Sequence, residues 1–324
     1  EKGLKIMYES FYGFKEKPFS LLPDPAFLFF AKQHKNALTM LEYGLTNQAG
    51  FTVITGDIGC GKTTLIRHLL NHVEHGVTVG LLSNTQKAIG ELLQWVLLAF
   101  RLPYQGKEKV ELYDVFFDFI GEEYAKNRRT VLIIDEAQNL GPETLEELRM
   151  LSNINADKDQ VLQLILVGQP ELRDTLSCSA LAQFAQRIAV DYYISALDAS
   201  QTRAYVTHRL TVAGGAADLF TAEARDLIHT ASGGIPRLIN TLCDTALVYG
   251  FAEQVPVIGA DLAREVIEDK ADSIVFSGRK KPDSDRREMV GAVPFPSARP
   301  VIEQNDAAAR EMYRDIFSSL DVRP

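Results

Sequence analysis

Cysteine is scarce in this sequence, with three residues among 324, namely Cys60, Cys178 and Cys243. They lie far apart and are odd in number, so their spacing fits neither a disulfide framework nor a zinc site built from cysteine pairs. Disulfides persist in oxidising compartments, so this usage indicates a protein of the reducing cytosol.

The sequence also lacks long apolar runs. No stretch approaches about 18 uninterrupted apolar residues, the length that indicates a membrane-spanning helix. The first residues, EKGLKIMYESFYGF, hold no apolar segment typical of a signal peptide. We therefore expect a cytoplasmic protein without direct membrane insertion, one that would reach the inner membrane only through partners.

An excess of basic residues is missing as well. The formal net charge is −9 at pH 7, which argues against a protein that coats nucleic acid through bulk charge, although a local basic patch stays open. Hydrophobic residues make up 46% and charged residues 24%, so a sizeable core is available. The length predicts two or three domains.

What the sequence does contain is a phosphate-binding loop. The β-rich run FTVIT leads directly into GDIGCGKT, and the apolar residues after it recur at helical spacing. Gly56, Gly59 and Gly61 can adopt backbone conformations closed to other residues, which lets successive N–H groups face phosphate oxygens. Lys62 can reach the β- and γ-phosphates, and the Thr63 hydroxyl can ligate Mg²⁺.

Cys60 lies inside this loop, directly before Gly61. The positive end of the following helix could lower its thiol pKa and make it reactive. We favour the plainer interpretation that a small side chain is tolerated there.

A second acidic element follows a buried strand. The apolar run at 130–134 ends in Asp135 and Glu136. Asp135 can hold Mg²⁺ through its water shell, and Glu136 can orient and deprotonate an attacking water. The pair stands 73 residues beyond Lys62 (135 − 62), with a strand and helices between. Both loops can therefore meet at one edge of the sheet, where ligands bind in open α/β folds.

Three more polar residues complete a candidate hydrolytic site. Gln169 follows the predicted strand at 161–167 and can hydrogen-bond the γ-phosphate or the water. Arg237 begins a later helix and could reach back to the phosphates. Arg187 precedes a strand-like run and could serve a neighbouring subunit as an arginine finger. Each is weak alone, and their order along the chain strengthens all three.

The pattern of elements predicts an α/β class. Continuous apolar strands alternate with helical patterns, which indicates a P-loop parallel sheet with helices on both faces. From about Asp198 the strands stop, and a small all-helical lid domain is expected, with helices at 199–213, 221–231, 236–251 and 260–270. The predicted divisions are an arm with a first helix (1–50), the P-loop core (51–197), the lid (198–270) and a disordered tail (271–324).

Segments near the two ends of the chain each allow two interpretations. Residues 8–30 are rich in aromatics and prolines without a clean period, so we expect an irregular ordered arm before a helix at 34–48. Pro18, Phe19 and their neighbours either wall the adenine side of a nucleotide pocket or simply pack against the core. A short helix near 306–320 could dock on a partner, although a solvated tail is favoured.

The tetrad from Asp135 to Gln138 also invites a helicase interpretation, because RNA helicases of the DEAD-box type carry a similar tetrad. Those enzymes need a second strand–helix domain of the RecA kind. Here helical patterns follow instead, so we set that interpretation aside.

Together these motifs resemble AAA+ ATPases. More narrowly, six motifs are similar to the general-secretion-pathway type A ATPases, and in particular to the branch associated with exosortase (PEP-CTERM) loci: YESFYGFKEKPFSLLPDP, GFTVITGDIGCGKTT, LIIDEAQNL, ILVGQPEL, QRI and GGIPRLIN. The resemblance covers about residues 7–270. It implies ATP and Mg²⁺ as ligands and names the residues that bind nucleotide: Gly56, Asp57, Ile58, Gly59, Cys60, Gly61, Lys62, Thr63, Thr64 and Arg237.

The resemblance also implies roles. Asp135 and Glu136 become the Walker B pair, Gln169 the sensor after the strand, Arg187 the finger and Arg237 the lid sensor. The leading hypothesis is an ATPase that assembles as an ATP-dependent homo-oligomeric ring and remodels a secretion or envelope-polysaccharide apparatus. Two alternatives stay open: a DNA-binding adaptor like the transposition regulators, which would bind duplex DNA, and a nucleotide-gated switch that scarcely turns ATP over.

Overall fold

The computed structural model describes residues 7–22, 24–72, 76–83, 92–156 and 159–271. The predicted helix near 306–320 and the predicted tail from 272 onward lie outside the described residues. The sequence-based limits of the domains stay a prediction.

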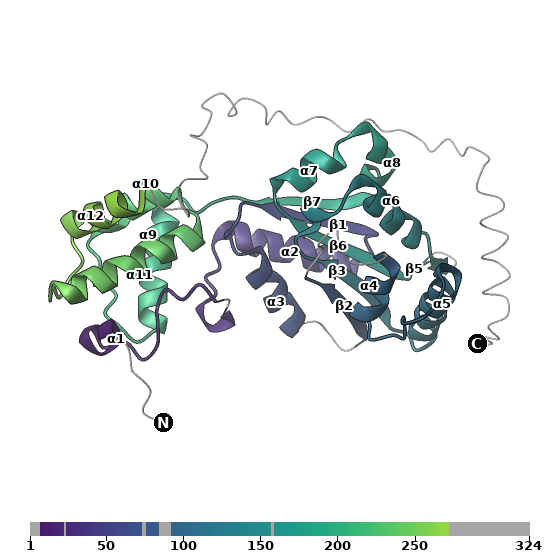
Figure 1. Ribbon diagram of the computed structural model, residues 1–324, viewed down its shortest axis with the longest axis horizontal. Coiled ribbons are helices and arrows are strands. Elements are labelled where there is room, and N and C mark those ends of the chain that lie inside the picture. Colours follow the sequence, from purple (N-terminus) through teal and green to yellow (C-terminus); the bar gives the residue numbers. More distant parts are fainter. Residues whose placement is uncertain (1–6, 23, 73–75, 84–91, 157–158, 272–324) are drawn as a thin grey trace. The chain divides into compact units, whose positions relative to one another are not determined.

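A five-stranded parallel sheet forms the centre of the chain (Figure 1). Its strands lie in the order β2-β3-β6-β1-β7, and every described pairing between them is parallel. Their bounds are β1 Phe51–Gly56, β2 Val77–Leu82, β3 Arg129–Ile134, β6 Leu162–Gly168 and β7 Ile188–Ile194. A separate small ribbon pairs β4 (Asn155–Ala156) with β5 (Asp159–Gln160). The predicted parallel α/β sheet is confirmed.

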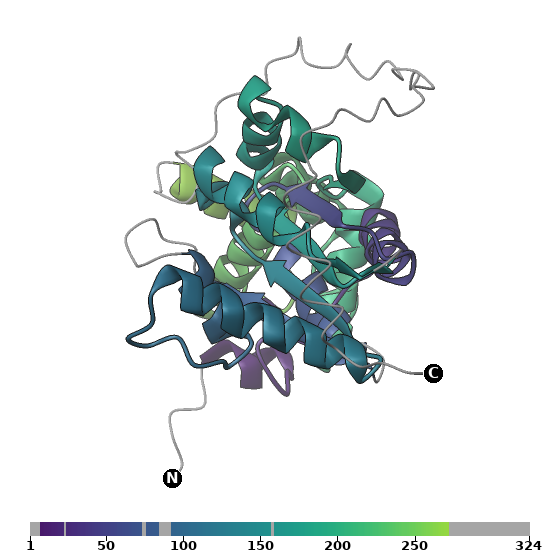
Figure 2. The same ribbon diagram turned by 90° about the vertical axis from the view of Figure 1, so that its right-hand side faces the viewer.

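Helices cover both faces of the sheet, as Figure 2 shows from the side. On one face α2 and α3 pack against side chains such as Ile54 and Ile133. Strand residues alternate between faces, and on the other face Phe51 contacts Phe184 of α8 with ring centroids 4.3 Å apart. The helices of the core are α2 Lys32–Thr46, α3 Lys62–His72, α4 Leu92–Ala99, α5 Lys109–Ala125, α6 Pro142–Leu151, α7 Pro170–Leu176 and α8 Ala182–Ala185. Short 3₁₀ turns are η1 Pro25–Phe27, η2 Ala137–Asn139 and η3 Ser179–Leu181.

Four helices follow the sheet, as predicted, within one or two residues of the expected bounds: α9 Ala199–Val212, α10 Ala222–Ser232, α11 Pro236–Ala252 and α12 Ala260–Ala271. Local signals set their ends. Asp198 caps α9 in a capping box with Gln201. Gly233 ends α10 in the left-handed conformation, and Pro236 stands at the first turn of α11, where its missing N–H is harmless.

The N-terminal segment is more regular than its sequence predicts. Residues Met7–Tyr12 form a short helix, α1, which the sequence did not predict because the segment has no helical periodicity. Tertiary contacts explain the helix, because Tyr8 donates a hydrogen bond to Asp244 of α11 and Tyr12 donates one to the carbonyl of Val255 over 3.0 Å. The segment is therefore held by the lid helices.

Candidate functional site

The phosphate loop joins β1 to α3 at the carboxyl edge of the sheet. Gly59 and Gly61 have φ of +82° and +99°, the left-handed region that glycine tolerates best. The same prediction for Gly56 is wrong, because its φ is not positive. Gly56 is required for space instead: a Cβ there would lie 2.7 Å from Cys60 Sγ and 2.8 Å from the carbonyl oxygen of Ile194.

Lys62 is folded back onto the loop. Its Nζ donates to the carbonyl oxygens of Gly56 at 2.6 Å and Asp57 at 3.0 Å, and the side chain is buried. Burial raises the pKa of the neighbouring Cys60 thiol, although Lys62 acts in the opposite sense. This direction favours the interpretation of Cys60 as a small residue of the loop over that of a reactive thiol.

The two halves of the predicted metal site lie in contact. Thr63 Oγ1 donates a hydrogen bond of 2.8 Å to Asp135 Oδ2, and Asp135 is buried at the end of β3. A hydroxyl and a carboxylate are hard oxygen ligands of the kind Mg²⁺ accepts when phosphates and waters supply the rest. Within the described ranges, no cluster of three or more His, Cys, Asp or Glu side chains could hold a metal alone. The residues fit a magnesium ion that is shared with a phosphate ligand.

Glu136 and Gln169 also meet, through a residue that sequence reasoning did not select. Glu136 Oε2 accepts hydrogen bonds from Gln138 Nε2 at 2.6 Å and from Gln169 Nε2 at 3.2 Å. Gln138 Oε1 accepts the backbone N–H of Gln169 at 3.0 Å, so Gln138 bridges the ends of β3 and β6. Glu136 itself is left-handed, with φ 54° and ψ 37°, a conformation that often marks functional positions.

Arg237 brings the lid onto the phosphate loop. Its backbone N–H donates to the carbonyl of Gly59 at 3.2 Å, and a Cβ on Gly59 would lie 2.4 Å from Arg237 Cβ. Gly234, just before α11, is fitted as closely to the end of the core, because its carbonyl accepts the N–H of Leu197 at 2.9 Å. The start of α11 is therefore fixed against the loop.

Arg187 is the predicted site residue that lies elsewhere. It directly precedes β7, whose first residue pairs with Phe51 while its last, Ile194, pairs with Gly56. The first residue of β7 is six residues from Ile194, and at about 3.3 Å per residue it lies roughly 20 Å from the phosphate loop. The side chain is exposed and donates a hydrogen bond to Asn153 Oδ1. Arg187 cannot reach the site of its own chain.

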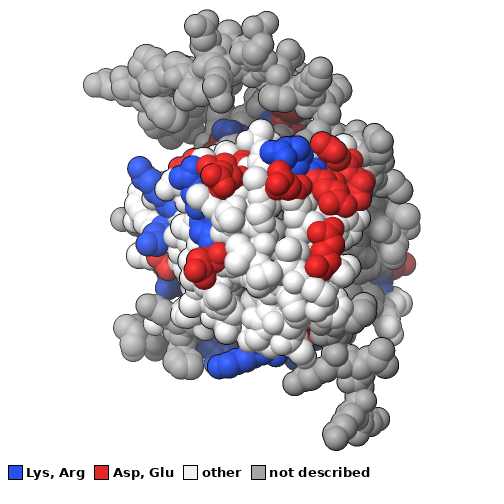
Figure 3. All heavy atoms as spheres, turned by 90° about the vertical axis from the view of Figure 1, so that its left-hand side faces the viewer, with Lys and Arg blue, Asp and Glu red and all other residues white. Residues whose placement is uncertain are grey.

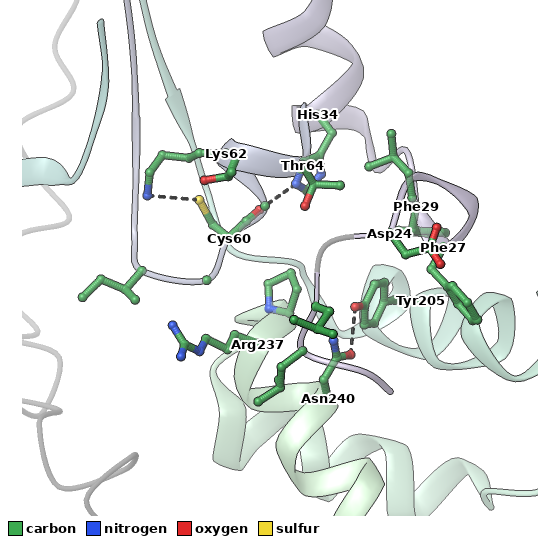
Figure 4. A pocket seen from close by; sticks show the side chains of 18 of the residues that line it. Asp24, Phe27, Phe29, His34, Cys60, Lys62, Thr64, Tyr205, Arg237 and Asn240 are labelled. Carbon is green, nitrogen blue, oxygen red and sulfur yellow. Dashed lines mark hydrogen bonds between the residues drawn. The ribbon is translucent and has the colours of Figure 1, made fainter. Parts of the chain in front are cut away.

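A cavity of about 310 Å³ is lined by most of the other predicted site residues, whereas Gly56, Asp57 and Asp135 are not among its lining residues (Figure 4). The loop from Ile58 to Thr64, Glu136 and Gln169 line its core side, and Arg237 and Asn240 line the lid side. The arm closes it further with Ser20, Leu21, Leu22, Asp24, Phe27, Leu28 and Phe29. Phe19, by contrast, is buried against Phe220 of the lid region, with ring centroids 6.0 Å apart, and does not line the cavity.

A buried arginine attaches this arm to the lid. Arg209 of α9 donates from Nε to the carbonyl of Pro18 at 2.5 Å and from Nη2 to that of Ser20 at 3.1 Å, and its guanidinium lies 4.6 Å from the centre of the Phe27 ring. Tyr205 donates to Asn240 Oδ1 at 2.8 Å beside it. Sequence reasoning did not select Tyr205 and Arg209, because α9 carries no motif, and only the structure shows that they line the cavity.

Known proteins resemble this chain in sequence and in fold. The family described as AAA domain matches residues 45–176. The general secretion pathway protein A of Aeromonas hydrophila is 40% identical over 247 residues, which cover 76% of this chain and 45% of that protein. The chain thus spans less than half the length of this relative.

Two solved structures extend the comparison to the fold. The ORC2 protein of Aeropyrum pernix, in ADPNP-ADP complexes, aligns with a TM-score of 0.57 and 17% identity over 79% of this chain and 72% of that one. Cdc6p from Pyrobaculum aerophilum aligns with a TM-score of 0.57 and 17% identity, over 76% and 71%. At these identities the likeness concerns the fold alone.

Among the described residues, no helix is both long and apolar enough to span a membrane. The sheet, the phosphate loop and the match over 45–176 agree with one another. The chain carries an AAA domain with the fold of a P-loop ATPase, and it is related in sequence to general secretion pathway protein A.

Proposed function

We propose that this chain hydrolyses ATP at the cavity under α11. The observation that carries the proposal is the convergence of Lys62, the Thr63–Asp135 pair, Glu136 and Arg237 around one space. Lys62 and the loop N–H groups bind the phosphates once Lys62 leaves the loop carbonyls. Thr63 and Asp135 hold Mg²⁺, which when bound neutralises charge on the phosphate oxygens.

Glu136 is the general base that orients and deprotonates the attacking water. Gln169 contacts the γ-phosphate or that water, and Arg237 contacts the phosphates from the lid. Gln169 already donates a hydrogen bond to Glu136, and the backbone N–H of Arg237 already donates one to the loop carbonyl of Gly59. Positioned polar groups of this kind stabilise charge that develops during phosphoryl transfer.

Arg187 completes the site of a second copy. It lies at the opposite end of β7 from its own phosphate loop and is exposed there. An arginine in this place can stabilise transferred phosphate only across a subunit interface. The proposal therefore includes a homo-oligomer, in the form of an ATP-dependent ring.

The apparatus on which the ATPase acts is proposed from its relative. The 40% identity to general secretion pathway protein A supports partners from a secretion or envelope-polysaccharide system, on the cytoplasmic side of the inner membrane. The finer assignment to the exosortase-associated branch rests on the resemblance of the whole set of motifs. The matched part is under half of that relative, so its whole activity is not transferred.

The competing function is a DNA-binding adaptor. On the face in Figure 3, lysine and arginine side chains lie at the left margin, near the top and at the lower edge, with aspartate and glutamate beside several of them, and uncharged residues fill the middle. Duplex DNA is held mainly through phosphates by basic surfaces, and that face offers no continuous one among the described residues. The net charge of −9 also favours a protein partner.

The test is ATP turnover by the purified chain, with and without duplex DNA at low salt. We expect Mg²⁺-dependent turnover that DNA does not change, and a loss of at least about a hundredfold in Glu136→Gln, which should accumulate as an ATP-bound oligomer. Normal turnover in Glu136→Gln would remove Glu136 from the role of base. Several-fold stimulation by DNA would replace the secretion partner with the adaptor function.

A further inference from the structure

His34 touches the phosphate loop and is not among the residues that the motifs select. It stands near the start of α2, is 5% exposed and lines the cavity. Its Nε2 lies 2.8 Å from the carbonyl oxygen of Cys60 (Figure 4). Because a carbonyl oxygen can only accept, Nε2 carries the proton and donates it.

That hydrogen bond fixes one peptide plane of the loop. The described chain has no cis peptide bond, and in a planar trans peptide the carbonyl and the following N–H point in opposite directions. With the Cys60 carbonyl held toward α2, the Gly61 N–H must point away from His34. The direction of a loop N–H is what decides whether it can bind a phosphate oxygen.

The absence of a side chain at Gly61 leaves space for the His34 ring. The φ of +99° at Gly61 is a conformation suited to glycine, and a Cβ at Gly61 would lie 3.2 Å from His34 Nε2. The absent side chain therefore leaves room for the histidine ring, and the ring then holds the peptide that precedes Gly61. Both features serve the same local geometry.

Two features of the surroundings disfavour the protonated form of His34. Burial lowers the pKa of His34, although its bond to the Cys60 carbonyl acts in the opposite sense. His34 Nδ1 is buried and has no hydrogen-bond partner among the described residues. Protonation would place a second N–H there without an acceptor, which costs free energy in a buried site.

We propose that His34 is a positioning residue for phosphate binding, one that orients the Gly61 N–H by holding the Cys60 carbonyl. The inference rests on the proposed function, in that a nucleotide phosphate occupies the loop. It gives α2, which carries no motif, a direct part in nucleotide affinity. Because the loop N–H is already oriented in the free protein, binding does not have to order it, and this preorganisation increases the affinity.

The test is the Kd for ATP, measured by calorimetric titration of three variants of His34. The side-chain amide nitrogen of glutamine can take the place of Nε2, whereas that of asparagine reaches only the place of Nδ1. We expect His34→Leu and His34→Asn to weaken ATP binding about fivefold to tenfold, the size of one hydrogen bond, and His34→Gln to stay within about twofold of wild type.

His68→Leu is the matched control, because His68 is a half-buried histidine of α3 outside the cavity. The affinity of this variant for ATP should equal that of the wild type. Unchanged binding in His34→Asn would overturn the inference, and so would equal weakening by His34→Gln and His34→Asn, which would mean that packing matters and the donor does not. If His34→Leu fails to fold, the Gln and Asn pair still decides. Failure of the proposed function would appear separately, as wild-type protein that binds no ATP.

Discussion

Thr63 and Asp135 are 72 residues apart in the chain and share a hydrogen bond of 2.8 Å from Oγ1 to Oδ2. The pair joins the start of α3 to the end of β3 across the carboxyl edge of the sheet. It sets the distance between the phosphate loop and the acidic strand end, and both proposed metal ligands lie in it.

This pair predicts a specific magnesium dependence. Asp135→Asn and Thr63→Val should each raise the Mg²⁺ concentration for half-maximal turnover at least about tenfold, since each removes one hard oxygen ligand or its charge. Thr63→Ser keeps the hydroxyl and should stay close to wild type. A magnesium titration of ATPase activity measures all three, and equal curves for Thr63→Val and Thr63→Ser would contradict the assignment.

Gln138 is predicted to act through Glu136. Gln138→Ala should lower kcat about tenfold while leaving the Kd for ATP within about twofold, because the base loses its 2.6 Å hydrogen bond and its link to the Gln169 backbone. Asn139→Ala, an exposed polar neighbour in the same turn, is the control and should leave both constants unchanged. A change confined to KM would assign Gln138 to binding instead.

Arg187 allows a test of the shared site. Arg187→Ala should reduce turnover at least about a hundredfold and spare nucleotide binding, since the residue lies roughly 20 Å from its own loop. Asn153→Ala removes one hydrogen-bond acceptor of Arg187 within the chain and should have a much smaller effect.

Mixing gives the decisive measurement for Arg187. Subunits of Arg187→Ala retain Glu136, and subunits of Glu136→Gln retain the finger, so mixed oligomers should recover activity that neither variant has alone. Absence of any recovery, with mixed assembly shown by cross-linking, would place the finger function on another residue.

Gly234 should be intolerant of any side chain. A Cβ there would lie 1.9 Å from the carbonyl oxygen of Leu197, and its φ of +75° disfavours other residues. We expect Gly234→Ala to lower the free energy of unfolding by about 2 kcal/mol or more and to weaken ATP binding, because the start of α11 would shift from the loop.

The control for that prediction is Gly259→Ala, also in the lid region, where a Cβ would meet no atom within 4 Å. It should change stability by less than about 0.5 kcal/mol. Urea denaturation of both variants provides the comparison, and equal midpoints would show that the contact between Gly234 and Leu197 does not hold the lid.

The sequence by itself predicted the phosphate loop, the strand that ends in Asp135 and Glu136, and the four lid helices. These features depend on signals that lie close together in the chain, such as glycine spacing, apolar runs and the capping residues Asp198 and Pro236. Such signals act on a few neighbouring residues, so they can be recognised without knowing the fold.

Only the tertiary structure decided the strand order, the attachment of the arm by Arg209, the bridge made by Gln138 and the contact of His34 with Cys60. It also corrected the reason for Gly56, which is crowded by Ile194 rather than left-handed. In each case the partners come from separate elements, and packing of those elements determines which side chains meet. His34 belongs to a helix without a motif, and it hydrogen-bonds the phosphate loop only because α2 packs against α3 and β1. No local sequence pattern encodes that packing.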